Sequence, residues 1–219
     1  MNHSLRLLIL SDVHYPYTDE AVLLDILREE KNADKIIFLG DNVREDRNGP
    51  KFLDLIKKTK DLKDVVFIRG NHDGEAIPCV DSFKLILNGK KLTFMHGDQF
   101  KIGSEGSTHK FGSILKKIHR ELPVLAFATV ARIKHQNKSG EYLILGHSHA
   151  LASFRRLRVV CVGCLTNEKS LYNEKGYVVI ESEGSEFNLS LISLGSTSES
   201  PNTRVDHITA EKVWDSSRS

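Results

Sequence analysis

Short apolar runs alternate with polar turns and amphipathic segments along the first third of the chain. Each run is nearly continuous and ends at a polar cluster, which is typical of a buried strand; the runs are Leu5–Leu10, Ile36–Leu39 and Val65–Ile68. Between them, apolar residues recur at helical spacing over 19–31 and 50–56, the latter beginning with Pro50. Repetition of strand, polar turn and helix predicts a parallel sheet with crossover helices.

The pattern changes after residue 80. Two apolar runs at 83–87 and 91–95 flank Asn88-Gly89, which predicts an antiparallel hairpin. From about residue 104 to 140, two helical faces follow one another, Pro123 restarting the second, and we interpret this segment as an inserted helical cap. Further strands are expected at 142–145, 159–162, 177–180 and 187–192, the last three in a second, largely antiparallel sheet.

These elements predict one α/β domain over residues 1–195 that includes the helical cap at about 104–140. A chain of 219 residues is long enough to bury about 70% of its unfolded surface, so a single core suffices. Residues 196–219 are rich in Ser, Thr and Asn, and we expect a mobile polar tail with a short helix near 205–214.

Charge is concentrated in the cap rather than in the whole chain. The formal net charge is +2, but residues 101–140 carry eight basic side chains against two acidic ones, a net of +6. A basic cap is consistent with a lid that steers a phosphate-bearing substrate, or with peripheral contact to nucleic acid or an anionic membrane. A solvated helix face is the alternative interpretation.

The three cysteines indicate a reduced, cytoplasmic protein, because their number is odd and no charged-then-apolar leader begins the sequence. Cys161 and Cys164 have the spacing of a redox pair or half a zinc site, yet no second ligand pair of similar spacing is evident. We therefore expect two buried thiols in a strand and its turn. No apolar run approaches the roughly 18 residues needed to span a bilayer.

Polar side chains follow five of the predicted strands at the point where each strand ends. They are Asp12 and His14, Asp41, Asn71 and His72, His96, and finally His147 and His149. Each cluster alone has the composition of an ordinary turn, but together they supply carboxylates, imidazoles and an amide at one sheet edge. Such a mixed nitrogen and oxygen set suits Mn, Fe, Zn or a similar ion.

These residues form an ordered set of motifs: Asp12-Val13-His14, Gly40-Asp41-Asn42, Gly70-Asn71-His72-Asp73, His96-Gly97 and Gly146-His147-Ser148-His149. In this order they resemble the calcineurin-like metallophosphoesterase superfamily. The resemblance implies a four-layer α-β-β-α sandwich with two mixed sheets and a dinuclear metal centre. It implies that Asp12, His14, Asp41 and His149 hold one metal, and that Asp41, Asn71, His96 and His147 hold the other.

The same resemblance implies a mechanism in which a metal-bridging hydroxide attacks phosphorus in line. Asp41 would bridge the two ions, since cations about 3.5–4 Å apart need a shared anionic ligand. Asn71 would complete the catalytic centre, and His72 would contact the phosphate and protonate the leaving oxygen. Asp73 is either an orienting residue or a helix cap, and Gly70 is the close turn that lets its neighbours face the ions.

Two departures from family patterns carry information. Phosphoprotein phosphatases have an acidic residue three positions after the bridging aspartate, where it orients the catalytic imidazole, but this chain has Arg44 there. The sequence therefore does not identify the group that orients His72. UDP-2,3-diacylglucosamine pyrophosphatases are similar in their basic helical insertion, but their third motif has arginine where His72 stands. The cap is therefore a hint of a lid over a phosphate ester or anhydride.

The leading hypothesis is a metal-dependent phosphoric ester hydrolase, a phosphatase or phosphodiesterase with two divalent ions, Mn being favoured over Fe, Zn or Ni. Its substrate would be a small phosphomonoester, phosphodiester or nucleotide-like pyrophosphate. One alternative is a catalytically silent scaffold that binds a protein partner. A nuclease is the other, although Phe111 and Phe127 lie on apolar helix faces, which argues against stacking on single strands.

Overall fold

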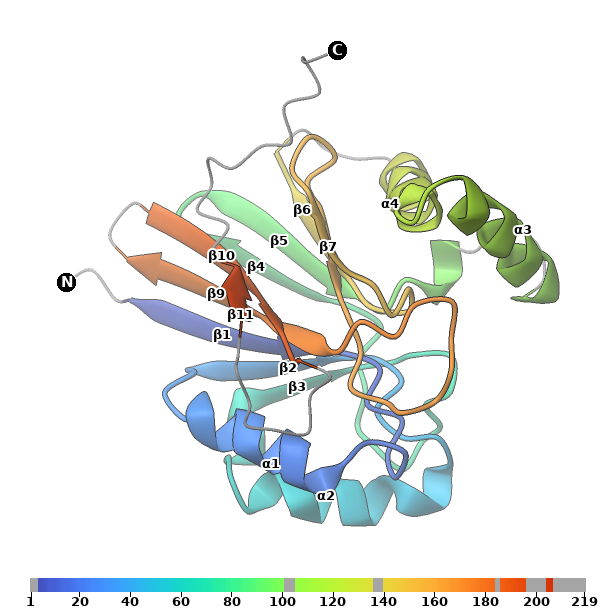
Figure 1. Cartoon of the computed structure of the whole chain (residues 1–219). Helices are drawn as coiled ribbons and strands as arrows, with labels where there is room; N and C mark the ends of the chain where they lie inside the picture. The colour runs from blue at the N-terminus through green and yellow to red at the C-terminus, as the bar shows by residue number, and fades with distance from the viewer. Residues whose placement is uncertain (1–3, 101–104, 136–139, 184–185, 196–203, 207–219) are drawn as a thin grey trace.

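The chain folds into two mixed β-sheets that face one another, with helices on both outer faces (Figure 1). The structure is a computed structural model and describes residues 4–100, 105–135, 140–183, 186–195 and 204–206. The first sheet has six described strands in the order β11-β10-β9-β1-β2-β3. Their bounds are β1 Leu5–Leu10, β2 Lys35–Leu39, β3 Val65–Ile68, β9 Gly176–Glu183, β10 Glu186–Ser193 and β11 Arg204–Asp206.

The second sheet has the order β4-β5-β6-β8-β7. Its strands are β4 Phe83–Leu87, β5 Lys90–Met95, β6 Tyr142–Leu145, β7 Leu151–Phe154 and β8 Val159–Val162. The hairpin expected around Asn88-Gly89 is present, because β4 pairs antiparallel with β5. Strand β6 then pairs parallel with both β5 and β8.

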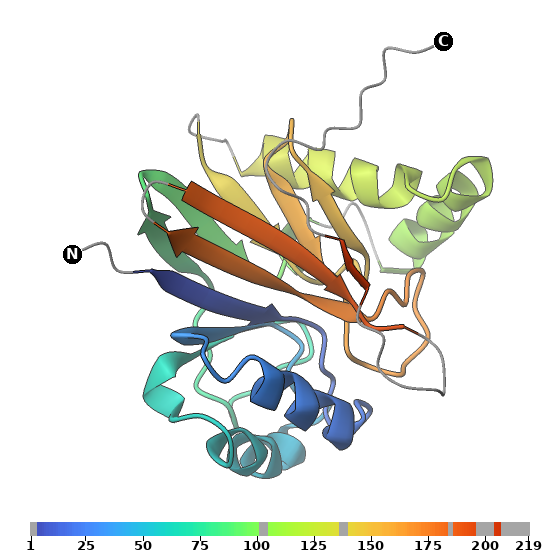
Figure 2. The same ribbon diagram turned by 60° about the vertical axis from the view of Figure 1, so that its left-hand side comes forward.

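Four longer helices cover the sheets, as Figures 1 and 2 show from two directions. Helices α1 (Glu20–Glu29) and α2 (Gly49–Lys57) lie on the first sheet, and α3 (Glu105–Ile118) and α4 (Leu122–Lys134) form the cap beside the second. Short 3-10 turns occur at η1 (Asp46–Asn48), η2 (Leu62–Asp64) and η3 (Asp98–Phe100). The predicted order of strands, helices and cap over residues 5–145 is thus confirmed.

Three apolar clusters separate the four layers. Leu8, Phe38 and Phe52 belong to the cluster between the first sheet and its helices, whereas Ile9 belongs to the cluster between the two sheets. A third cluster joins the second sheet to α4. Alternate residues of β1 and β2 face different clusters, which explains why these strands are apolar at every position. The expected α-β-β-α sandwich is confirmed.

The sequence pattern predicts the wrong sheet for the strands at 177–180 and 187–192. Strands β9 and β10 do not join the second sheet; β9 pairs antiparallel with β1 in the first sheet, and β10 pairs with β9. Strand β9 thus pairs with the edge of β1 that β2 does not occupy, so the backbone of β1 is hydrogen-bonded on both sides. The second sheet is consequently not largely antiparallel, because both neighbours of β6 run parallel to it.

Two smaller expectations also changed. Strand β7 was not expected, because its sequence Leu-Ala-Ser-Phe is too weakly apolar to signal a strand. The helix expected near 205–214 is wrong at its start, where Arg204–Asp206 form β11 against β10. The rest of that segment lies outside the described residues, as do residues 1–3 and 196–203 of the predicted domain and tail.

The sheet topology brings the predicted polar clusters to one place. Strands β1, β2 and β3 run parallel, so the residues after Leu10, Leu39 and Ile68 leave the first sheet at the same edge. In the second sheet the parallel pair β5 and β6 ends in register at Met95 and Leu145. The turns after these five strands carry the candidate ligands.

Candidate metal centre

Most of the candidate ligands sit on backbone that turns sharply at the strand end. Asp12, His14, Asp41, His147 and His149 all have positive φ, between 48° and 61°. This left-handed region is uncommon for residues with a side chain and is held where surrounding structure over-determines it. Backbone hydrogen bonds fix the turns: the amide of His14 donates to the carbonyl oxygen of Asp41 at 2.7 Å.

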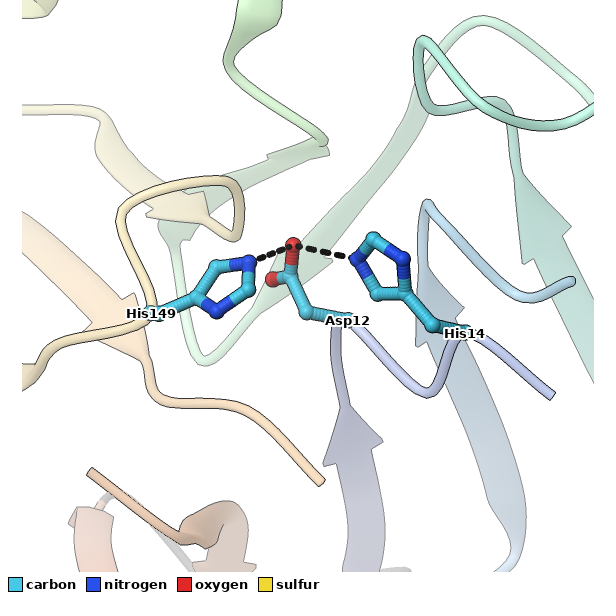
Figure 3. Close-up of side chains that lie close together, drawn as sticks. All are labelled: Asp12, His14 and His149. Atoms are coloured by element: carbon cyan, nitrogen blue, oxygen red, sulfur yellow. Dashed lines mark ion pairs between the residues drawn. The ribbon is translucent and has the colours of Figure 1, made fainter. Parts of the chain in front are cut away.

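The two carboxylate oxygens of Asp12 have different surroundings: one accepts hydrogen bonds from neighbouring turns and the other faces imidazoles. Its Oδ2 accepts hydrogen bonds from the hydroxyl of Ser11 at 2.5 Å and the amide of His147 at 2.9 Å. Its Oδ1 faces Nε2 of His149 at 3.2 Å and Nε2 of His14 at 3.9 Å, as Figure 3 shows. The framework thus orients one oxygen toward two imidazoles from β-strand turns far apart in the sequence.

Asp41 repeats this arrangement. Its Oδ1 accepts a hydrogen bond from the amide of His72 at 2.9 Å. Its Oδ2 faces the Nε2 atoms of His96 at 3.4 Å, His14 at 3.5 Å and His72 at 3.9 Å. A carboxylate oxygen surrounded by three imidazoles is the most central point of the cluster.

Two glycines allow this close approach. A side chain at Gly40 would overlap the ring of His96, and one at Gly70 would overlap the carboxylate of Asp41. Gly40 also has a φ of +86°, which favours glycine. Gly70 therefore lets the turn close over Asp41, in agreement with the role expected for it from the sequence.

Asp73 ties two of the turns together. Its Oδ1 accepts hydrogen bonds from the amides of Asn42 and Val43, and its Oδ2 accepts from the amide of Gly70. Burial raises the pKa of this carboxyl, with a further contribution from nearby Asp41. Of its two expected roles, the structure shows the orienting one.

The buried charges of the centre depend on one another. Burial disfavours the ionised forms of Asp12 and Asp41, but the surrounding imidazoles outweigh it: the pKa of Asp12 lies well below its ordinary value and that of Asp41 is lowered to about 2. Burial also disfavours the charged forms of His96 and His149, but the carboxylates raise both pKa values to about 10. Burial, and then His96, lowers the pKa of His147 to about 4.

Several of these buried atoms have no hydrogen-bonding partner among the described residues. Oδ1 of Asp12 and the Nε2 atoms of His14 and His96 are buried without one. Leaving such groups unsatisfied costs free energy, so a site that gathers them needs another occupant. Oxygen and imidazole nitrogen are the ligands preferred by Mn, Zn or Fe, and the donor set fits a divalent cation.

Three overlapping groups of these side chains could each hold an ion. They are Asp12 with His14 and His149, Asp41 with His14 and His72, and Asp12 with Asp41 and His96. The structure thus brings together six of the eight residues predicted for the site, Asn71 and His147 aside. His147 lies beside His96, with ring centroids 5.1 Å apart, and Asn71 is exposed on the wall of the same cavity.

The structure also shows what contacts His72. Nη1 of Arg44 lies 3.0 Å from Nε2 of His72 and also contacts its Nδ1. Nε of the same guanidinium lies 3.3 Å from Oε1 of Glu168. Arg44 therefore lies between His72 and Glu168.

Glu168 lies beside the centre and was not among the residues predicted from the sequence. Its Oε2 lies 2.9 Å from Nδ1 of His14, on the opposite side of the ring from Asp12 and Asp41. A carboxylate behind a ligating histidine fixes its tautomer and orientation. The only signal in the sequence was an acidic residue in the loop that follows β8, several residues beyond the strand end.

The centre opens into a cavity of about 760 Å³. Its walls include His14, Asp41, His147 and His149 at the centre, and residues of α3 and α4 from the cap. A cavity of this size accommodates a small molecule rather than a lone phosphate.

No helix in the described part of the chain is long and apolar enough to cross a membrane.

One of the three thiols lies at the edge of this centre, because the side chain of Cys164 interacts with the imidazole of His149. Cys161 lies in β8 and Cys164 two residues after its end, both buried and free, as expected. Burial raises the pKa of Cys161 to about 12, which keeps it protonated and unreactive.

The chain belongs to the calcineurin-like phosphoesterases. The family model of that description matches residues 5–151, which include every candidate ligand. The family binds divalent metals, in agreement with the donor set assembled at the strand ends. No curated protein matches the sequence.

Solved structures share the fold at low sequence identity. Wild-type Vps29 from Entamoeba histolytica, complexed with Zn²⁺, has a TM-score of 0.61 at 16% identity and covers 93% of this chain and 98% of that chain. Vps29 from Chaetomium thermophilum, complexed with a cyclic peptide, has a TM-score of 0.57 at 15% identity and covers 94% and 96%. These likenesses show the α-β-β-α fold.

Proposed function

We propose that the chain is a metal-dependent phosphoric ester hydrolase with a dinuclear centre. The observation that carries the proposal is the pair of buried carboxylates, Asp12 and Asp41, each with one oxygen held by backbone amides and the other turned toward imidazoles. The overlapping donor groups that share these two carboxylates support a pair of neighbouring cations.

The ligand assignment that we propose is the one implied by the family resemblance, and the donor geometry supports part of it. In one site we place Asp12, His14 and His149, and in the other His96, His147 and Asn71, with Asp41 shared between them. Asp41 suits the shared position because its Oδ2 faces both His14 and His96. Manganese is our preferred metal, since a carboxylate, amide and imidazole set without sulfur suits it, with Fe, Zn and Ni as alternatives.

Bound divalent ions would supply positive charge that activates water and neutralises the phosphoryl oxygens. The protein supplies the geometry around them. Glu168 orients His14, while the amide of His72 orients Asp41. Arg44 lies at the cavity wall beside His72, where its planar guanidinium can bind a phosphate oxygen and leave the imidazole of His72 to donate a proton to the leaving group.

The direct experiment is a turnover panel with the metal-reconstituted protein. Aryl phosphomonoesters, bis-aryl diesters, cyclic nucleotides and nucleoside diphosphate sugars are tested with Mn, Zn, Ni and Fe, with Asp41→Ala as the blank. Metal-dependent hydrolysis of at least one class, lost in Asp41→Ala, is expected. Inactivity with every ester and metal would overturn the proposal and favour the second candidate, a scaffold for a protein or peptide partner in a reducing, cytoplasmic compartment.

A peptide-binding role has one specific observation in its favour, the cyclic peptide carried by the structurally similar Vps29 from Chaetomium thermophilum. A scaffold does not need the buried carboxylate and imidazole cluster that this chain retains, so we rank it second. A nuclease ranks third, and a steep fall of substrate affinity with salt would be its signature.

A further inference from the structure

The cavity at the metal centre continues between the cap helices and the loop after β8. Phe127 of α4 marks the transition, because its ring centroid lies 6.2 Å from that of His147. Beyond Phe127, every described residue that α3 and α4 contribute to the cavity wall is apolar or glycine, among them Leu115 and Val130. The opposite loop contributes Leu171 together with the polar residues Lys169, Ser170 and Tyr172.

The basic residues in the described part of the cap do not line this apolar part. Nη2 and Nε of Arg132 donate to the carbonyl oxygens of Glu141 and Leu157. Arg120 pairs with Glu174 at 2.7 Å, and Nζ of Lys116 donates to the carbonyl oxygen of Leu171 and lies over the ring of Tyr172. The positive charge that suggested a phosphate-steering lid is in part used to attach the cap.

The attachment also fixes the shape of the cavity. Gly112 of α3 packs so closely on Leu171 that a side chain there would meet it at 2.7 Å. The hydroxyl of Tyr172 donates its hydrogen to the carbonyl oxygen of Arg120 in the cap, so this hydrogen is not available to a ligand in the cavity. The loop that carries Glu168 and the cap helices therefore form one continuous wall.

We propose that this apolar chamber binds the alcohol part of the substrate, so that the preferred substrates are phosphate esters of a bulky apolar alcohol. The inference rests on the proposed function, because the phosphate must lie at the metal centre while the ester group extends past Phe127. A sugar or nucleoside in the same place would lose hydrogen bonds to water without regaining them from the side chains of the cap helices. An alkyl group gains about fourfold in affinity for each methylene buried.

The test is binding of n-alkylphosphonates, which cannot be hydrolysed at the carbon–phosphorus bond, to the Mn-loaded protein by titration calorimetry. With part of the chain left in water, octylphosphonate is expected to bind at least about 100-fold more tightly than methylphosphonate. Leu115→Asn and Val130→Asn each lower this preference about tenfold. Ala126→Phe fills the chamber and lowers the affinity for the octyl compound while leaving the methyl compound unaffected.

Matched controls lie on the outer faces of the same helices. Ile114 and Ile133 are 58% and 71% exposed and do not line the cavity. Ile114→Asn and Ile133→Asn are expected to keep the full preference. Equal affinity for the two phosphonates, including no binding of either, would overturn the inference, and so would an equal loss in the control variants.

Failure of the proposed function gives a different result. If no phosphate ester is hydrolysed with any metal but the octyl preference persists and responds to Leu115→Asn, the chamber is an apolar ligand site without catalysis. If methyl and aryl esters are hydrolysed with Mn but longer alkyl groups bring no gain, the hydrolase is correct and the apolar chamber is not its alcohol site.

Discussion

Nε2 of His96 lies 3.4 Å from Oδ2 of Asp41, while Nδ1 of the same ring lies 2.9 Å from the carbonyl oxygen of Leu39. Nδ1 must carry a hydrogen to donate to that carbonyl, so Nε2 is the nitrogen available to a metal or a second proton. Without metal, burial disfavours the charged form of His96, but attraction to the neighbouring carboxylates is stronger and raises its pKa to about 10. Proton and metal therefore compete for one atom.

This competition predicts that thermal stability depends less steeply on pH with metal than without it. A folded pKa of about 10, above the ordinary 6.5, contributes stability that is complete below 6.5 and is lost as pH rises toward 10. The Tm of chelator-treated protein should fall across this window, and that of Mn-saturated protein should fall less, because the metal binds the neutral ring. Thermal scans at several pH values check this, and identical slopes with and without Mn would contradict it.

Gly40→Ala should destabilise the protein and weaken metal binding, because its methyl group would overlap the ring of His96. Gly89 provides a control: its φ of +73° is also left-handed, but a side chain there meets nothing within 4 Å. Gly89→Ala should cost about 1 kcal/mol from backbone strain alone, and Gly40→Ala about 2 kcal/mol more. Denaturant unfolding measures both, and equal losses would show that the ring contact is unimportant.

Glu168→Gln should lower Mn affinity about 10- to 100-fold, since a carboxylate behind His14 holds that ring in the ligating orientation. The fold should be unaffected, because Glu168 lies in a loop and is partly exposed. Glu45→Gln is the matched control, as Glu45 pairs with Arg47 on the surface. Calorimetric titration with Mn²⁺ compares the variants, and an unchanged affinity in Glu168→Gln would remove Glu168 from the centre.

Arg44→Gln should raise the KM for a phosphate ester about tenfold and lower kcat less, since a charge-assisted hydrogen bond to the bound phosphate would be lost. Arg47→Gln, which changes a guanidinium whose side chain is 80% exposed, should leave both parameters unchanged. Steady-state kinetics with the ester of the panel that is hydrolysed fastest measures KM and kcat for both variants. A pure loss of kcat in Arg44→Gln would indicate that Arg44 acts through His72 rather than on the substrate.

Local signals account for what could be predicted from the sequence. Apolar runs such as Leu5–Leu10 indicate buried strands, and a polar turn such as Gly70-Asn71-His72-Asp73 marks a strand end, so the strands and the grouping of polar residues at their ends follow from these patterns. The four-layer sandwich was instead implied by the family resemblance of the motifs. An apolar strand does not report which edge it joins, which is why β9 was assigned to the wrong sheet. Glu168 was hidden because a loop residue reaches His14 only through the tertiary fold.

The most direct test of the two-metal account is the number of Mn²⁺ ions bound per chain at equilibrium, measured by dialysis with elemental analysis in wild type and Asp41→Asn. The shared carboxylate predicts two ions per wild-type chain, and a marked weakening of both sites in Asp41→Asn. One ion or none in the wild type, or two ions retained with unchanged affinity in Asp41→Asn, would contradict a dinuclear centre bridged by Asp41.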